Sequence, residues 1–207
     1  GKTGRAGLNA FLVDASLPGI RTGTPYEPYR YAGSIMGEVV FDSVHVPGEA
    51  LLGEAGSGYF LLMETLDRGR PLVAAGCVGS AKRVFDLVLD YAKNRSQFGK
   101  PLFSFQDISL PLAEYATRLQ ASRLLTFHAL SRIDSGLSFS LEASMAKLHA
   151  AEILFDLAGF GVEILGYRTV ADTPMSREIT RIHKDAQLMK SIDGTQAVQK
   201  MVIASQL

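Results

Sequence analysis

The spacing of apolar residues changes near Gly56, and this change limits the folds that are open to the chain. Before it, the apolar run over residues 8–13 and the alternation Val44-His45-Val46 are bounded by glycine and proline, which is typical of strands and turns. After it, apolar residues recur every three or four positions, as on one face of a helix. The sequence therefore predicts a short β segment followed by helices.

The helical part shows three long stripes, over residues 78–92, 112–127 and 141–158. Asp134-Ser135-Gly136 marks the end of the second, and the pattern loosens over residues 159–166. A further helix is expected to hold Met189 and Ile192, and the last is expected to begin near Thr195. We predict a mainly α protein, with an antiparallel helical bundle over residues 53–207 and a partial β-sheet or barrel segment over residues 1–52. Two or three strands do not make a stable sheet alone, so the β segment is expected to be the incomplete end of a larger domain.

The composition excludes several classes of protein. Among 207 residues, 21 basic and 21 acidic side chains balance, so no charge surplus favours nucleic acid or an anionic membrane. No apolar run approaches the ~20 residues of a membrane span, and no signal peptide is visible. The single cysteine, Cys77, is interpreted as a packing residue, and the four histidines lack metal-ligand spacing, so no metal site is predicted. The expected location is cytoplasmic, or the mitochondrial matrix in a eukaryote. The opening GKTG suggests a truncated or processed product.

Five sequence motifs, taken in their order along the chain, indicate the chemistry of the protein. The run over residues 90–101, DYAKNRSQFGKP, combines cations, an aromatic ring and a helix stop, and Gln106 follows it. It is preceded by VPGEALLGEAGSGY over residues 46–59 and by Arg70 with Pro71, and it is followed by EASMAK over residues 142–147 and by Asp193-Gly194-Thr195. In order and spacing these motifs resemble the acyl-CoA dehydrogenase family, from the end of its middle β domain through its C-terminal helical domain.

The resemblance implies a flavin-dependent enzyme that oxidises an acyl-CoA thioester to the 2,3-enoyl-CoA, with FAD as cofactor. A carboxylate removes the α-proton while a hydride leaves the β-carbon, so the base must lie within hydrogen-bonding reach of its proton. The family's usual base is the glutamate of EGT, and this position holds Asp193, whose carboxylate is one methylene and roughly 1 Å shorter in reach. From the residues alone, Asp193 also suits a helix N-cap. The alternative base position of some members, just before Arg70, is occupied by Gly69.

Further residues match positions that support the base or contact the flavin. Arg70 matches an arginine close to the base that tunes it, although a buried ion pair with Asp67 or Glu64 is the alternative. Cofactor contacts are implied for Arg95, which would reach the FAD pyrophosphate of a neighbouring subunit, and for Phe98, Gln106, Thr195 and Gly166. The segment around Gly166 departs from the family pattern, because Glu163 stands for a glutamine and Tyr167 for a glycine, and Ala197 also stands for a glutamine.

These matches leave three functional hypotheses. The first is a dehydrogenase with Asp193 as base, an electron-transfer flavoprotein as acceptor, and a homo-oligomeric state of two or four subunits. The second is a non-catalytic family subunit that lends half a flavin site to a heteromer, which the departures at Asp193, Glu163, Tyr167 and Ala197 keep open. The third is a helical interaction module without a cofactor. In each case the 207 residues alone are expected to be inactive, because the family's N-terminal helical domain and the first half of its β domain are not part of them.

Overall fold

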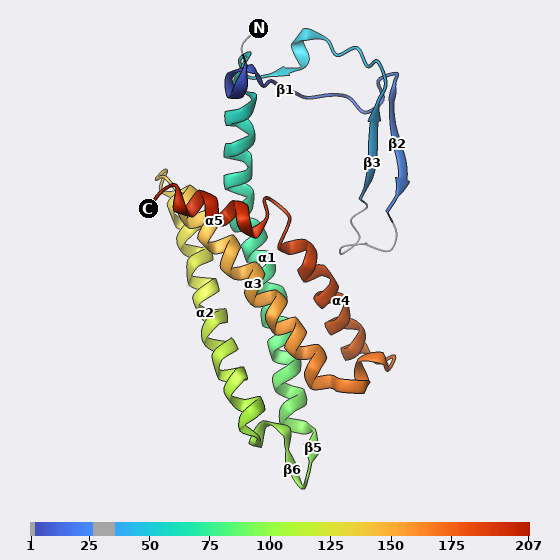
Figure 1. The fold of residues 1–207 in the computed structure, drawn as a ribbon, viewed down its shortest axis with the longest axis vertical. Coiled ribbons are helices and arrows are strands. Elements are labelled where there is room, and N and C mark those ends of the chain that lie inside the picture. Colours follow the sequence, from blue (N-terminus) through green and yellow to red (C-terminus); the bar gives the residue numbers. More distant parts are fainter. Residues whose placement is uncertain (1–2, 27–35) are drawn as a thin grey trace. The chain divides into compact units, whose positions relative to one another are not determined.

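The computed structural model describes residues 3–26 and 36–207, and these residues form two compact units, Gly1–Thr65 and Leu66–Leu207 (Figure 1). The boundary falls inside the long helix α1 (Gly58–Asn94), which begins in the first unit and continues through the second. The assignment of residues 1–52 to the end of a middle β domain, and of residues 53–207 to a C-terminal helical domain, stays a prediction.

The first unit contains two antiparallel strand pairs. Strand β1 (Ala10–Phe11) pairs with β4 (Leu51–Leu52), and β2 (Ile20–Pro25) pairs with β3 (Gly37–Phe41), with an irregularity between Thr22 and Pro25. Two short 3₁₀ turns, η1 (Gly4–Gly7) and η2 (Gly48–Ala50), complete it. The partial β-sheet that the sequence predicts is confirmed as strand pairs of this kind.

Two strand predictions in this unit are wrong in extent. The run over residues 8–13 is a strand only at Ala10 and Phe11, and Val44-His45-Val46 is not a strand. A β conformation needs a partner to accept and donate the ladder hydrogen bonds, and among the described residues the alternation at 44–46 has none. Phe11, Val39 and Phe41 are exposed, so among the described residues these strands carry apolar side chains that are not covered.

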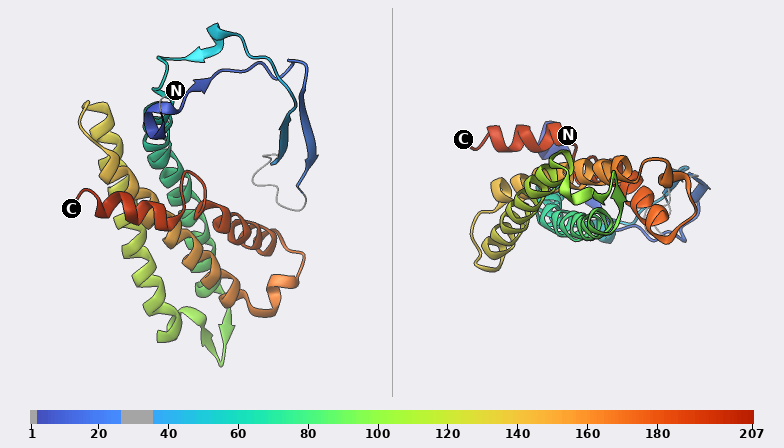
Figure 2. Two further views of the ribbon diagram at one scale, coloured as in Figure 1. Left: turned by 45° about the horizontal axis from the view of Figure 1, so that its top comes forward. Right: turned by 90° about the horizontal axis from the view of Figure 1, so that it is seen from below.

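The second unit is a helical bundle, as the sequence predicts. After α1 come a small hairpin of β5 (Ser96–Gln97) and β6 (Lys100–Pro101) and the turn η3 (Leu102–Ser104). The remaining elements are α2 (Gln106–Asp134), α3 (Ser140–Leu165), η4 (Gly166–Val170), α4 (Pro174–Met189) and α5 (Gln196–Ala204). Figures 1 and 2 show α3 between α2 and α4, with α5 crossing it. Helix α3 is the centre of the bundle because it is buried on most of its sides.

Small residues allow the helices to approach closely. A Cβ added to Gly161 of α3 would lie 3.1 Å from Ile179 of α4 and 3.2 Å from Val88 of α1, so α3 packs tightly on both neighbours at this glycine. Alanines fill much of the rest of the interface: Ala74, Ala81, Ala92, Ala143, Ala146, Ala150, Ala151 and Ala158 are buried. These small residues let the helices pack closely around larger buried side chains such as Leu154, Leu157 and Ile179.

One helix prediction is wrong, and two segments show detail that the periodicity did not give. The pattern loosens over residues 159–166, yet α3 runs without interruption to Leu165; Gly161 inside it allows close packing, and Gly166 follows its end with φ 54°. Ile192 lies outside any helix, since α4 ends at Met189. After the helix stop that the sequence indicates, residues 96–101 form the β5–β6 hairpin, in which Phe98 and Gly99 take positive φ. The predicted helix end at Gly136, which has φ 67°, is confirmed.

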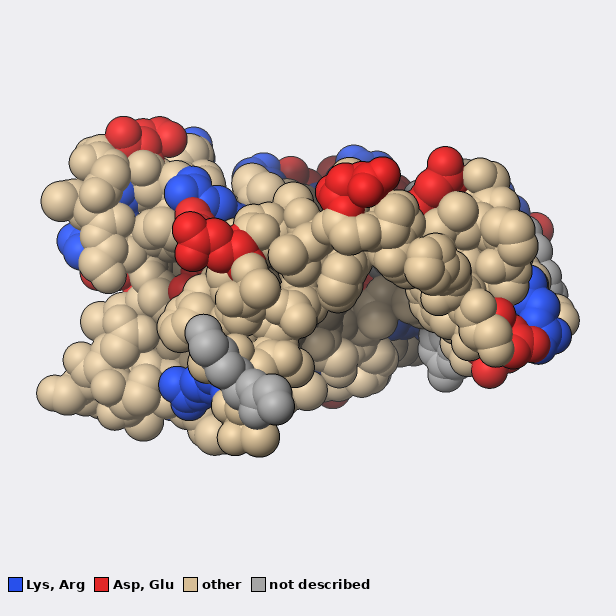
Figure 3. All heavy atoms as spheres, turned by 90° about the horizontal axis from the view of Figure 1, so that it is seen from above, with Lys and Arg blue, Asp and Glu red and all other residues tan. Residues whose placement is uncertain are grey.

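On the face that Figure 3 shows, basic and acidic side chains are both scattered, and neither gathers into a dominant patch. This agrees with the balance of 21 basic and 21 acidic residues. Over residues 3–26 and 36–207, no helix combines the length and the hydropathy needed to cross a bilayer.

Candidate active site

Asp193 lies in the turn that leads from α4 into α5. Its backbone has φ 52° and that of the following Gly194 has φ 102°, so two successive residues take the left-handed region. The N-cap of α5 is Thr195, whose hydroxyl accepts a hydrogen bond from the Val198 backbone N–H at 3.4 Å. The N-cap interpretation of Asp193 is therefore wrong, because the capping position falls two residues later. Its carboxylate is left available for another role.

The Asp193 side chain packs against α1 at Gly69. A Cβ added to Gly69 would lie 2.5 Å from Oδ2 of Asp193, which is closer than real Cβ contacts come. Asp193 is half-buried, neither sealed in the core nor fully open to solvent. The position before Arg70 thus accommodates the carboxylate of Asp193 because it carries no side chain of its own.

Arg70 joins α1, α3 and the Asp193 turn. The Arg70 side chain is only 3% exposed, and its Nη1 donates to a carboxylate oxygen of Asp67 and, at 3.2 Å, to the hydroxyl of Ser144 on α3. Its Nε lies 3.5 Å from the backbone carbonyl of Asp193. The ion pair with Asp67 that the sequence left open is present, and Arg70 also reaches the turn that carries the candidate base.

The structure adds Lys147, which the sequence analysis did not single out although it ends the EASMAK motif. Its side chain is fully buried, and Nζ donates to the carbonyls of Gly194 at 2.8 Å and Lys190 at 3.1 Å. Burial lowers the pKa of Lys147, while the nearby Cys77 and Asp193 act to raise it. The signal in the sequence was a lysine within an otherwise apolar or small-residue face of α3.

Gln199 of α5 completes the support of the turn. It is fully buried, and its amide nitrogen donates to the carbonyls of Asp193 at 3.1 Å and Gly194 at 3.0 Å. Three buried side chains from three helices, Arg70, Lys147 and Gln199, therefore bind the carbonyls of one turn.

Three of the candidate cofactor residues gather at the far end of α1. Arg95 follows the last residue of α1 and is half-buried, and Gln106 begins α2. Phe98, at the tip of the β5–β6 hairpin, is 92% exposed, and its ring meets Phe105 edge-on. An exposed aromatic ring can contact a flat ring system and a guanidinium can bind a diphosphate, so the chemistry of these residues fits a flavin nucleotide.

The other two candidates lie elsewhere. Thr195 is next to the Asp193 turn, and Gly166 begins η4 at the end of α3, with φ 54° and no atom within 4 Å of an added Cβ. The open backbone at Gly166 permits close approach of a ligand. Tyr167 beside it is 76% exposed, and Glu163 and Ala197 are exposed as well.

The separation of these groups is large. Arg70 and Arg95 are 25 positions apart on or next to α1, roughly 37 Å along a helix axis. Figure 1 shows the β5–β6 hairpin and α5 toward opposite ends of the helical unit. One chain therefore does not bring Arg95 and Asp193 together.

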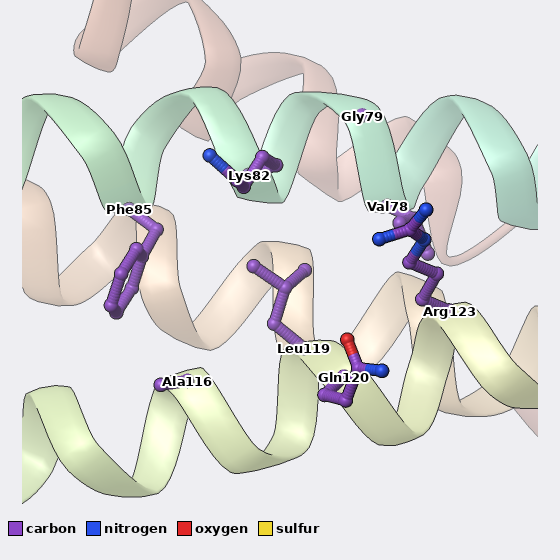
Figure 4. A pocket seen from close by; sticks show the side chains of 8 residues that line it. All are labelled: Val78, Gly79, Lys82, Phe85, Ala116, Leu119, Gln120 and Arg123. Carbon is purple, nitrogen blue, oxygen red and sulfur yellow. The ribbon is translucent and has the colours of Figure 1, made fainter.

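A groove with a volume of about 370 Å³ lies between α1 and α2, away from the Asp193 turn (Figure 4). Figure 4 shows Phe85 of α1 directed toward α2, and Arg123 of α2 directed toward α1 near Val78. Lys82 on its rim pairs with Asp86. The groove is mainly apolar and has no carboxylate in its lining, so it is not a candidate for acid–base chemistry.

Comparison with known proteins decides the family. The model of the acyl-CoA dehydrogenase C-terminal domain matches residues 56–207. The chain belongs to the acyl-CoA dehydrogenase family. This confirms the resemblance that the motifs indicated, and it agrees with the mainly helical fold.

Individual members of the acyl-CoA dehydrogenase family extend the match to nearly the whole chain. An acyl-CoA dehydrogenase of Bacillus subtilis is 37% identical over 205 residues, which is 99% of this chain and 53% of that protein. A subunit of the caffeyl-CoA reductase–Etf complex of Acetobacterium woodii is 35% identical over 205 residues, again 99% of this chain and 53% of that protein. The structure of butyryl-CoA dehydrogenase from Megasphaera elsdenii matches with a TM-score of 0.90 and 34% identity, covering 98% of this chain and 52% of that one. The chain thus spans about half the length of these relatives.

Proposed function

We propose that this chain forms the C-terminal half of a flavin-dependent acyl-CoA dehydrogenase in which Asp193 is the catalytic base. The observation that carries the proposal is the placement of Asp193. The carboxylate of Asp193 lies against Gly69. The turn that carries it is fixed because Arg70, Lys147 and Gln199 bind the backbone carbonyls of this turn, and the carboxylate does not cap α5.

As catalytic base, Asp193 needs a carboxylate that is ionised and placed next to the α-proton of the substrate. The C–H bond at the α-carbon of the acyl thioester breaks, and its proton passes to a carboxylate oxygen of Asp193. The β-carbon loses a hydride, and the product is the 2,3-enoyl-CoA. When bound, FAD supplies the two-electron acceptor for that hydride. Arg70 supports the base by fixing the backbone of Asp193 through its carbonyl.

FAD is the proposed cofactor, with Arg95, Phe98, Gln106, Gly166 and Thr195 as its contacts. The distance along α1 between the Asp193 turn and Arg95 favours a site to which two copies contribute, because one chain would hold the two groups far apart. Arg95 would then serve the cofactor of a neighbouring subunit, while Thr195 serves the one near its own Asp193.

A homo-oligomer of two or four chains is the proposed assembly. Leu72, Leu124 and Phe127 are each more than half exposed, and they belong to α1 and α2, the helices that line the groove of Figure 4. Such apolar surface is typical of a contact with another protein. Sedimentation of the complete protein should show an assembly that Phe127→Glu disrupts, and a monomeric unmodified protein would contradict it.

An electron-transfer flavoprotein is the proposed electron acceptor. The support is that one relative, 35% identical, is a subunit of a complex with Etf. Oxidation of acyl-CoA by the complete protein should be coupled to reduction of an electron-transfer flavoprotein in a spectrophotometric assay.

The decisive experiment is Asp193→Asn in the complete protein, assayed for acyl-CoA oxidation with an artificial electron acceptor. We expect the flavin content to be kept and turnover to fall by roughly 10²- to 10⁴-fold, because an amide cannot accept the α-proton. The matched control is Asp172→Asn, since Asp172 is an exposed carboxylate paired with Arg177 on the surface. Unchanged turnover in Asp193→Asn would reject the base assignment.

The second candidate function is the non-catalytic subunit of a heteromer. The exposed Tyr167 and Glu163, which stand beside Gly166 where the family has a glycine and a glutamine, favour it. In that case the unmodified protein has no turnover alone, and activity that appears with a partner subunit does not depend on Asp193. A helical module without a cofactor has no specific observation in its favour.

A further inference from the structure

Lys147, a fully buried basic residue of the helical unit, contacts the turn that carries the candidate base. Lys147 lies in α3 with no solvent exposure, and it is the largest of the fully buried side chains among the described residues. A buried ammonium lowers the stability of the folded protein unless its protons have hydrogen-bond acceptors, so the acceptors around Nζ indicate the role of Lys147.

The surroundings of Lys147 match a charged ammonium. Nζ has three protons to donate and can accept none, and three oxygen acceptors lie within reach. They are the carbonyl of Gly194 at 2.8 Å, the carbonyl of Lys190 at 3.1 Å and the side-chain oxygen of Gln196 at 3.5 Å. All three belong to the segment that begins after α4 and enters α5. Lys147 therefore ties this segment, and no other, to α3.

The same contacts explain the backbone of the turn. With the carbonyls of Lys190 and Gly194 directed at Lys147, and that of Asp193 directed at Gln199 and Arg70, the peptide groups of the turn face inward. Asp193 then takes its left-handed conformation, and its side chain meets α1 at Gly69. The direction of the carboxylate follows from where the carbonyls are bound.

We propose that Lys147 is the positioning residue for Asp193: its ammonium fixes the turn over residues 190–194 to α3 and so sets where the carboxylate stands. The proposal rests on the proposed role of Asp193 as base. It extends that role by naming a residue that touches no substrate and acts through backbone carbonyls. Besides Asp193, the groups that act on the charge of Lys147 are Arg70 and the thiol of Cys77, both on α1.

The structural test is amide hydrogen exchange of the complete protein, read over residues 190–199. In Lys147→Met, which keeps the length of the side chain without its charge or donors, exchange in this segment should accelerate roughly tenfold or more, as expected for a lost hydrogen bond to a charged group. Exchange in the hairpin over residues 96–101, remote from Lys147, should not change. Unchanged exchange over residues 190–199 would overturn the proposal.

The functional test separates positioning from general stability. Lys147→Met should lower kcat by about a hundredfold, the effect of moving a catalytic group by about 1 Å, with KM for the acyl-CoA within twofold of the original. Lys147→Gln keeps one donor group and should lose less, and it replaces the methionine variant if that variant does not accumulate. The matched control is Leu157→Ala, which removes a fully buried side chain from the same helix far from the turn and should leave kcat unchanged at temperatures where it is folded.

The outcomes distinguish this proposal from the proposed function. If Asp193→Asn abolishes turnover while Lys147→Met and Leu157→Ala have equal kcat, Lys147 does not position the base and only this inference falls. If Asp193→Asn keeps full turnover, there is no base at this turn to position, and both proposals fall. A kcat loss in Lys147→Met that Leu157→Ala does not share, with faster exchange confined to the turn, supports the inference.

Discussion

The Cα of Gly69 on α1 lies directly against the carboxylate of Asp193, so that a single added carbon would come within 2.5 Å of Oδ2. The two residues are far apart in sequence, and the contact accounts for the residue type at one position and the side-chain placement at the other. The glycine is required because the carboxylate is there, and the carboxylate has room because the residue before Arg70 has no side chain.

Gly69→Ala should separate activity from stability. The added methyl displaces the Asp193 carboxylate by about 1 Å, so turnover should fall by roughly a hundredfold. Because alanine favours a helix interior over glycine by about 1 kcal/mol, the loss of packing at the turn should be partly offset and the melting temperature should change little. Gly76→Ala is the control, since Gly76 is on the same helix and nothing lies within 4 Å of its added Cβ. Equal turnover in the two variants would contradict the contact.

The stability of variants at Asp193 should depend on the positive φ of this residue rather than on the loss of a helix cap. At φ 52°, glycine and asparagine are tolerated, whereas alanine costs about 1 kcal/mol through its Cβ. Denaturant unfolding should therefore rank Asp193→Gly and Asp193→Asn above Asp193→Ala, although all three lose turnover. An alanine variant as stable as the glycine variant would show that the left-handed conformation is not kept.

Stability should fall in mild acid because of His149. Burial lowers the pKa of His149, which hydrogen-bonds Ser122 of α2 at 2.6 Å; Arg118 lowers it further and Glu152 opposes this. Below its ordinary value of 6.5 the unfolded chain binds the proton first, so the free energy of unfolding decreases as the pH falls from 6.5 through the lower folded pKa. Thermal melting between pH 7.5 and 5.5 should show this decrease, and His149→Gln should reduce it. An identical pH dependence in the variant would assign the effect to other groups.

Cys77 should be unreactive in the folded protein. Burial raises the pKa of its thiol to about 12, and the side chain has no solvent exposure. At pH 8 the thiolate fraction is then roughly a thousandfold below that of an unperturbed cysteine, so iodoacetamide should label the Cys77 peptide only after denaturation, as judged by mass spectrometry. Comparable labelling rates with and without denaturant would mean that α1 opens readily at this point.

The sequence by itself determined the two-part architecture and the family. Hydrophobic periodicity is a local property, so the switch near Gly56, the long helices and the helix end at Gly136 could all be predicted from neighbouring residues. The order and spacing of the motifs identified the family because both can be seen in the sequence without the structure, and the family model confirms the match. Asp193 could be named as a candidate for the same reason.

Only the tertiary structure decided how that candidate is held. The contact of Arg70 with the Asp193 carbonyl joins residues 123 positions apart, and that of Lys147 with the Gly194 carbonyl joins residues 47 apart. Periodicity indicates that a helix face is buried, but it does not indicate what covers that face. It could therefore not show that Lys147 binds a turn or that Gly161 packs closely against Ile179 and Val88. The backbone of Asp193 depended on those same distant donors, and a capping motif read locally therefore placed the cap two residues too early.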